Sequence, residues 1–156
     1  MPGDPRPAYN SSMDSELTTM AEAASEPPPR WSVGGLLIEA LARQDFAALA
    51  DCLDPAVRLR ALVPRGPIDM TGRDDVAGWF RSLFGGPDDL ELADGTVGEI
   101  GPRLYMRWRV SLTPTGTSGL RRLAEQHVFA ITGTGGHITA MDLLCSGFIT
   151  QAEHGP

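Results

Sequence analysis

Apolar residues recur at helical spacing in three segments of the chain. Over residues 33–41, Val, Leu and Ala stand at i, i+3, i+4, i+7 and i+8, which is one face of a helix. The same spacing predicts a short helix over 46–53, capped by Asp45, and a longer helix over 76–84. The sequence Gly-Gly-Pro at 85–87 ends the third helix.

Alternating and β-branched stretches separated by turn residues predict strands in the rest of the chain. The predicted strands cover 56–63, 68–71, 90–99, 104–113, 120–132 and 137–150. Turn sequences at 101–102, 114–119 and 133–136 separate the last four. Two helices, two strands, a third helix and four long antiparallel strands predict an α+β fold, with a curved, mostly antiparallel sheet packed on the helices.

The chain has 156 residues, which suits one domain and a tail. Residues 1–30 contain six of the thirteen prolines and few large apolar side chains, so we expect a disordered tail there. The folded domain is expected over 31–150, followed by a flexible C-terminus over 151–156. With 42% hydrophobic residues, the domain can build a core.

The charge and the reactive side chains narrow the possible functions. The formal net charge is −7, which disfavours nucleic acid as a partner. No apolar run is long enough for a membrane span and no secretory signal is visible, which favours the cytoplasm. Cys52, Cys145 and the three histidines show no metal-binding spacing, so we expect neither a metal nor a cofactor.

A candidate acid–base pair follows from the pairing of the last two predicted strands. If 133–136 is a four-residue hairpin loop, His127 faces Asp142 across the pair, and Glu125 and Phe129 share their face. A one-residue slip would move His127 and Asp142 to opposite faces. A carboxylate beside an imidazole is suited to proton transfer, because it fixes the tautomer and raises the basicity of the ring.

The preceding hairpin adds apolar residues to this predicted face. If Thr113 faces Leu120, then Met106 and Trp108 lie on the face of His127 and Asp142. The result would be ionisable groups set in an apolar wall. Arg107 and Arg109 would then point away from it.

Three stretches resemble the nuclear transport factor 2-like superfamily, and within it the SnoaL-like polyketide cyclase branch. They are LIEALARQDFAALADCLDPAVRL, MTGRDDVAGWFRSLF and GGHITAMDLLCSGF. The resemblance covers about residues 31–150 and implies a cone-shaped fold, often dimeric. It also implies an acid–base Asp on the last strand, matching Asp142, with a His nearby.

The resemblance suggests a cofactor-independent cyclase or isomerase of secondary metabolism that acts on a hydrophobic, carbonyl-bearing, polyketide-like intermediate. Asp142 and His127 are the catalytic candidates. The expected substrate-binding residues are Trp79, Trp108, Met106, Phe129, Glu125 and Leu59. In a variant of this mechanism the cavity only folds the substrate for ring closure, and the reaction then needs no acid–base residue.

Two other functions stay open. Val128, Ala130, Met141 and Leu143 make the opposite face of the strands apolar too, so the face of His127 and Asp142 could instead point outward and form a subunit interface. The chain would then be a non-catalytic, dimeric small-molecule-binding or interaction module. An epoxide hydrolase of the limonene-epoxide type is the further alternative, although residues 107–109 lack the Asp of the Arg-x-Asp motif of that branch.

Overall fold

The computed structural model describes residues 29–115 and 120–151. The predicted tail over 1–30 and C-terminus over 151–156 lie almost wholly outside these residues. The helices are α2 (Arg30–Ala42), α3 (Phe46–Asp51) and α4 (Arg73–Phe84). The strands are β1 (Leu53–Val63), β2 (Gly66–Thr71), β3 (Asp89–Ile100), β4 (Arg103–Thr113), β5 (Arg121–Thr132), β6 (Ile138–Cys145) and β7 (Ile149–Gln151).

The three predicted helices form, although α3 ends at Asp51 and Leu53, which was predicted as part of it, begins β1. The Asp45 side chain caps α3 by accepting a hydrogen bond from the backbone N–H of Ala48 at 3.0 Å. Asp74 and Asp75 occupy the first turn of α4, where negative charge favours the helix dipole. The backbone N–H of Gly85 bonds to the Arg81 carbonyl and closes the end of α4.

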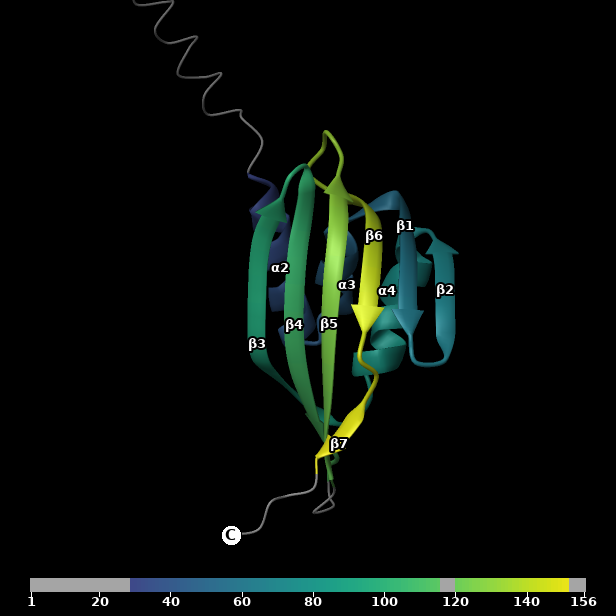
Figure 1. Ribbon diagram of the computed structural model, residues 1–156, viewed down its shortest axis with the longest axis vertical. Helices are drawn as coiled ribbons and strands as arrows, with labels where there is room; N and C mark the ends of the chain where they lie inside the picture. Colours follow the sequence, from purple (N-terminus) through teal and green to yellow (C-terminus); the bar gives the residue numbers. More distant parts are fainter. Residues whose placement is uncertain (1–28, 116–119, 152–156) are drawn as a thin grey trace, which may run out of the picture.

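The strands form one curved, open sheet with the order β2-β1-β6-β5-β4-β3 (Figure 1). Neighbouring strands along this order are antiparallel, except β1 and β6, which are parallel. The expected fold class is therefore confirmed. The prediction of one strand over 137–150 is wrong, because the chain leaves the sheet after Cys145, with Gly147 at a φ of 75°, and re-enters it as β7.

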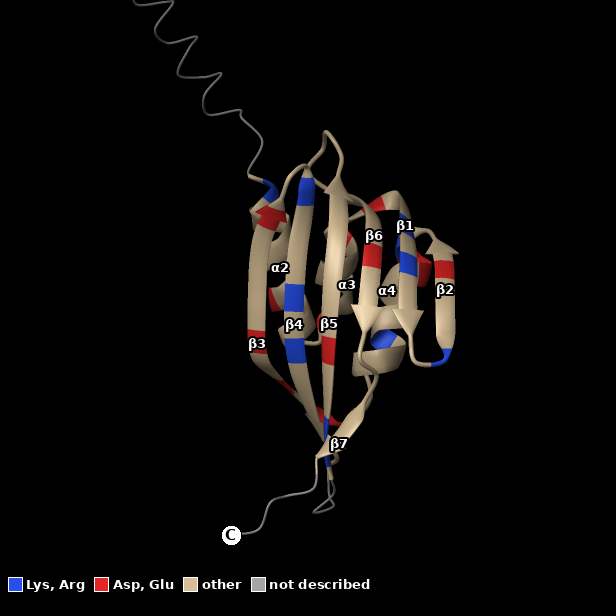
Figure 2. Ribbon diagram, in the orientation of Figure 1, with Lys and Arg blue, Asp and Glu red and all other residues tan. Residues whose placement is uncertain are grey.

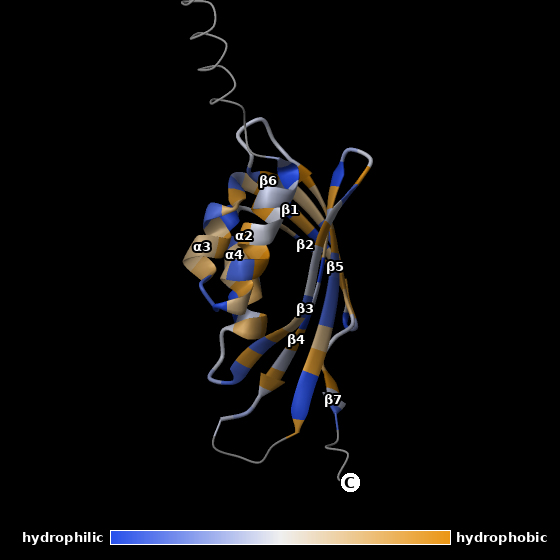
Figure 3. Cartoon of the chain, turned by 90° about the vertical axis from the view of Figure 1, so that its left-hand side faces the viewer, coloured by the Kyte–Doolittle hydropathy of each residue, from blue (hydrophilic) through white to orange (hydrophobic). Residues whose placement is uncertain are grey.

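Within the described part of the chain, the three helices cover the same side of the sheet, and no other described segment covers the opposite, bare side (Figure 3). We call the helix-covered side the inner face and the bare side the outer face. Leu59, Met106, Trp108, Val128 and Met141 represent the inner face and are almost completely buried. Helix residues such as Phe80, whose ring centroid lies 6.2 Å from that of Trp108, complete the core. Among the described residues, no helix has the length and apolar character needed to cross a membrane.

One polar side chain, Gln126, is completely buried on the inner face. Its Oε1 accepts a hydrogen bond from Trp108 Nε1 at 2.9 Å, and its Nε2 donates to the Sγ of Cys145 at 3.3 Å. The indole N–H thereby obtains the partner that a buried donor needs.

Replacing Gln126 with leucine should lower the free energy of unfolding by about 1–3 kcal/mol, because the Trp108 N–H is then buried without an acceptor. The double variant Trp108→Phe/Gln126→Leu should lose less than the sum of the two single changes. Urea denaturation of the four proteins measures this coupling. Strict additivity would mean that the hydrogen bond contributes nothing.

Candidate functional site

The β5–β6 pairing differs by two residues from the predicted pairing. Asp142 stands opposite Phe129, and His127 stands opposite Leu144, so the prediction that His127 faces Asp142 is wrong. The turn is one residue longer than predicted, since Thr132 pairs with Ile138. An irregularity between Thr132 and Ile131 shifts the register by one further residue. A register shift of two residues leaves each side chain on the same side of the sheet, so His127 and Asp142 still share one face.

The β4–β5 pairing differs by one residue from the predicted pairing, and this reverses the side. Trp108 pairs with Gln126 and Met106 with Val128, where the prediction paired them with Glu125 and His127. Met106 and Trp108 therefore lie on the inner face, away from His127. The predicted pairing assumed a turn over 114–119, of which 116–119 lie outside the described residues.

The predicted site residues are thus divided between the two faces. Leu59, Met106 and Trp108 lie in the core on the inner face, and Trp79 of α4 packs beside them with its ring 5.1 Å from Phe80. The outer face carries Glu125, His127, Phe129 and Asp142. Met106 and Trp108 therefore do not form the apolar wall that was predicted around Asp142 and His127.

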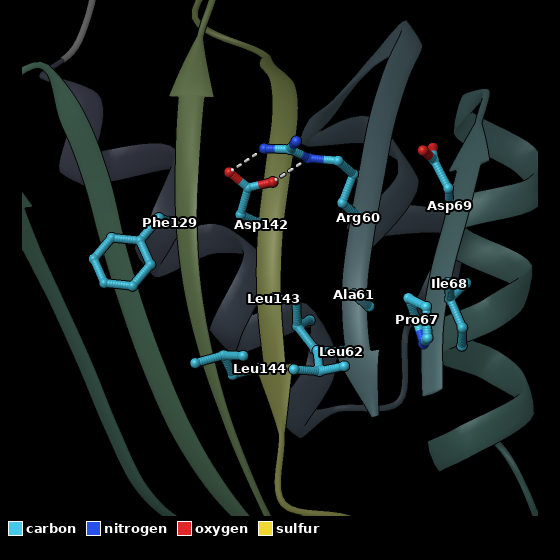
Figure 4. A pocket seen from close by; sticks show the side chains of 10 residues that line it. All are labelled: Arg60, Ala61, Leu62, Pro67, Ile68, Asp69, Phe129, Asp142, Leu143 and Leu144. Atoms are coloured by element: carbon cyan, nitrogen blue, oxygen red, sulfur yellow. Dashed lines mark hydrogen bonds and ion pairs between the residues drawn. The ribbon is translucent and has the colours of Figure 1, made fainter. Parts of the chain in front are cut away.

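The outer face is hollowed by an open groove of about 620 Å³ over β1, β2, β5 and β6. Its walls are mostly apolar, and two carboxylates and one guanidinium stand at one end (Figure 4). The lining residues are Arg60, Ala61, Leu62, Pro67, Ile68, Asp69, Phe129, Asp142, Leu143 and Leu144.

Asp142 is tied into an ion-pair cluster at this end of the groove. Arg60 binds it through two hydrogen bonds, with Nε–Oδ1 at 2.7 Å and the second nitrogen at 2.9 Å from Oδ2, and Arg103 reaches Oδ2 at 3.2 Å. The hydrogen bond from Arg60 is the main cause that lowers the pKa of Asp142, and Arg103 adds to it. A carboxylate held in this way is a weak base, which makes Asp142 poorly suited to remove a proton from carbon.

His127 belongs to a different chain of hydrogen bonds. Its Nδ1 lies 3.0 Å from the hydroxyl of Tyr105, and its Nε2 lies 3.0 Å from Oε1 of Glu125. Arg109 bonds to Glu125 at 3.2 Å and is the main cause that lowers the pKa of Glu125, with His127 adding to it. The carboxylate partner of His127 is therefore Glu125, two residues earlier on the same strand.

Sequence reasoning missed Arg60, Arg103 and Tyr105 as members of these clusters. Arg60 carried a usable signal, since it alternates with the apolar residues Leu59 and Ala61 and so had to lie on the less buried side of β1. Arg103 and Tyr105 lie beside Asp142 and His127 only because of the β4–β5 register, which differs by one residue from the predicted register.

Exposed apolar side chains surround these clusters. Leu62 and Leu144 pair directly across β1 and β6, and both are more than half exposed. Ile131 is also exposed, and Phe129 lies between it and His127 on the same side of β5. Figure 2 shows blue segments on β4 and β1 and red segments on β5, β6 and β2 around this area. The outer face is thus an apolar patch with charges of both signs beside it.

Acid should weaken the fold through the carboxylates of the outer face. Asp69, Glu125 and Asp142 have pKa values below their usual range, so their stabilisation is complete above about pH 4, the range of unfolded carboxyl groups, and is lost as the pH falls through the lowered folded pKa. Since Asp142 is 35% exposed, its ion pairs should contribute only about 1 kcal/mol or less.

Urea denaturation at pH 6 and pH 3 tests this dependence. Asp142→Asn should reduce the loss of stability between the two pH values, whereas Asp89→Asn, at an exposed carboxylate, should not. An unchanged loss in Asp142→Asn would show that this cluster has no part in the acid sensitivity.

Comparison with known proteins identifies the family. The model of the SnoaL-like domain matches residues 36–143, which is more than half of the chain. A candidate polyketide cyclase from Xanthomonas campestris pv. campestris aligns with 20% identity over 74% of this chain and 89% of its own, at a TM-score of 0.57. A candidate polyketide cyclase from Pseudomonas putida KT2440 aligns with 16% identity over 75% and 91%, at a TM-score of 0.58.

A candidate ketosteroid isomerase from Kribbella flavida DSM 17836 aligns with 19% identity over 81% of this chain and 82% of its own, at a TM-score of 0.53. At these identities the likeness concerns the fold. A search of curated protein sequences gives no match. The family match covers α3, α4, β1–β5, the second half of α2 and most of β6, and the chain therefore belongs to the family of SnoaL-like domains.

Proposed function

We propose that this SnoaL-like domain is a non-catalytic interaction module in which two copies of the chain associate through their outer faces. The observation that carries the proposal is the open groove on the bare side of the sheet, with Leu62, Phe129 and Leu144 in its walls. A contiguous exposed apolar patch beside charged residues is typical of a protein–protein contact.

The charges of the outer face favour a second copy as the occupant. In a dimer with two-fold symmetry the same patch of each copy forms the contact. A face with positive and negative charges can therefore place its positive groups against the negative groups of the second copy. Asp142 stands between Arg60 and Arg103, and Glu125 contacts Arg109. A stable contact of this kind covers about 800 Å² on each partner.

The same geometry argues against proton transfer by Asp142. Its carboxylate lies in an open groove, it is neutralised by two guanidiniums, and its pKa is lowered. General bases in enzymes that work near neutral pH usually have a raised pKa and restricted access to water.

The solution mass of the full chain tests the proposal. Sedimentation velocity near pH 8 should give a species of twice the chain mass of 16.7 kDa at micromolar concentration. A species of 16.7 kDa at all concentrations up to about 100 μM, well above the micromolar affinity of a standard interface, would overturn it.

A cyclase or isomerase that acts on a hydrophobic, carbonyl-bearing molecule is the second candidate. The observation that favours it is Gln126, whose amide lies among the apolar side chains of the inner face. Its Nε2 has a thiol, a weak acceptor, as partner, and so retains the capacity to donate to a carbonyl oxygen. Such a reaction would use Gln126 and Trp108 and not His127 or Asp142, which lie across the sheet.

Two bicyclic probes of matched shape test this candidate. In an NMR titration, 1-tetralone, which has a carbonyl, should shift the Trp108 indole N–H resonance, and tetralin, which has none, should shift it less. Equal shifts from both probes, or shifts confined to residues of the outer face, would count against an inner-face carbonyl site.

A further inference from the structure

The hydrogen bonds of His127 define which ring nitrogen carries the proton when the ring is neutral. The ionised carboxylate of Glu125 can only accept a hydrogen bond, so Nε2 carries the hydrogen and donates it at 3.0 Å. Nδ1 is then bare and accepts from the Tyr105 hydroxyl at 3.0 Å. Neutral His127 therefore satisfies the hydroxyl of Tyr105 and an oxygen of Glu125 at once.

This hydrogen-bonded chain borders the apolar part of the proposed interface. His127 stands opposite Leu144 on β6 and opposite Arg107 on β4, and its side chain is 38% exposed. The Tyr105 ring lies 5.3 Å from that of Phe129, which lines the groove. A second copy that covers Phe129 and Leu144 would remove water from Tyr105 and His127 as well.

A proton on Nδ1 would reverse the bond to Tyr105. The ring would donate to the phenol oxygen, and the phenol hydrogen would need a new acceptor in a surface that the second copy has closed to water. A buried donor without an acceptor is unfavourable by an amount comparable to a hydrogen bond. In the separated chain, water supplies that acceptor.

The proton would also add charge to a surface with a positive excess. The charged groups that face the groove and the strands beside it, drawn from six strands, are Arg58, Arg60, Arg103, Arg107, Arg109, Asp69, Asp94, Glu125 and Asp142. Five positive and four negative groups leave one positive charge per copy while His127 is neutral. Two copies placed face to face double this excess, and two protonated rings would double it again.

We propose that protonation of His127 weakens the association of the two outer faces, so that the assembly senses pH; this inference rests on the proposed function. Histidine is the side chain whose usual pKa lies between pH 5 and 8, so its imidazole ring ordinarily changes charge in that range. The arginines stay charged throughout that range, and the lowered pKa values of Glu125 and Asp142 keep these carboxylates ionised at pH 5.5. His127 is the histidine among these groups.

Sedimentation of the full chain at pH 8.0 and pH 5.5, at equal ionic strength, tests the proposal. The dissociation constant should rise about tenfold or more at pH 5.5. The His127→Gln variant keeps a donor and an acceptor but cannot gain charge, so its dissociation constant should change little. His137→Gln, in the turn before β6, should keep the full response. Circular dichroism at both pH values checks that the fold is intact.

The outcomes separate this inference from the proposed function. A dimer of equal strength at both pH values, or a full response in His127→Gln, would overturn the role of His127 and leave the dimer standing. A chain that is monomeric at pH 8.0 would overturn the proposed function and this inference together.

Discussion

Leu144→Glu is expected to convert the dimer into a monomer at micromolar concentration. Leu144 is 51% exposed, pairs with Leu62 across the sheet and lines the groove. A glutamate there would replace an apolar contact with a charge that association has to remove from water, once in each copy, so association should weaken by at least about 100-fold. Leu36→Glu is the matched control, because Leu36 is 58% exposed but lies on α2, on the helix side of the sheet.

Sedimentation velocity at one chain concentration compares the two variants with the parent chain. Leu36→Glu should sediment as the parent does, and Leu144→Glu should sediment as the single chain. If both variants dissociate, the surface of contact is not the outer face. If neither does, Leu144 lies outside the contact.

Trp108→Ala should give the largest loss of stability of any tryptophan substitution in the chain. Trp108 is completely buried, contacts Phe80 and donates to Gln126, so its removal leaves a cavity and an amide oxygen without its donor. The expected cost is about 3–5 kcal/mol of unfolding free energy. Trp31, which is exposed at the start of α2, should cost less than about 1 kcal/mol when replaced by alanine.

Urea denaturation followed by circular dichroism orders the tryptophan variants. Trp79→Ala should fall between the other two, because Trp79 is half-buried against Phe80. A similar midpoint for all three variants would contradict the assignment of the inner face as the core.

The sequence was sufficient to predict the helices and the order of the strands. Helical spacing of apolar residues marks α2 and α4, although α2 buries Leu37, Ile38 and Leu41 and leaves the predicted Leu36 exposed. Asp45 marks the start of α3 through its capping bond. These signals are local, because the residues that carry them lie in the helix itself or next to its first residue.

The registers could not be predicted, because they depend on turns whose length the sequence does not fix. One added turn residue and one register shift moved β6 by two positions and kept Asp142 on the face of His127. A single residue of difference between β4 and β5 sent Trp108 to the other side. Since side chains alternate with a period of two, the second error changed the candidate site more than the first.

Which face is inward was also beyond the sequence. Both sides of β5 and β6 carry apolar residues, for example Val128 on one side and Phe129 on the other. The described helices pack on the face of Leu59, Trp108 and Met141, which makes it the inner face. They do not cover the face that carries Phe129, Leu144 and the ion pairs. The interface alternative that the sequence left open is the one that this arrangement favours.

Photo-crosslinking from the outer face tests the pairing of two copies most directly. We would place p-benzoylphenylalanine at Leu62, which is 53% exposed on the outer face, or at Leu36 on α2 as the control, and irradiate the full chain near pH 8. A covalent product of twice 16.7 kDa is expected from position 62 and none from position 36. No product from position 62, or equal products from both positions, would contradict it.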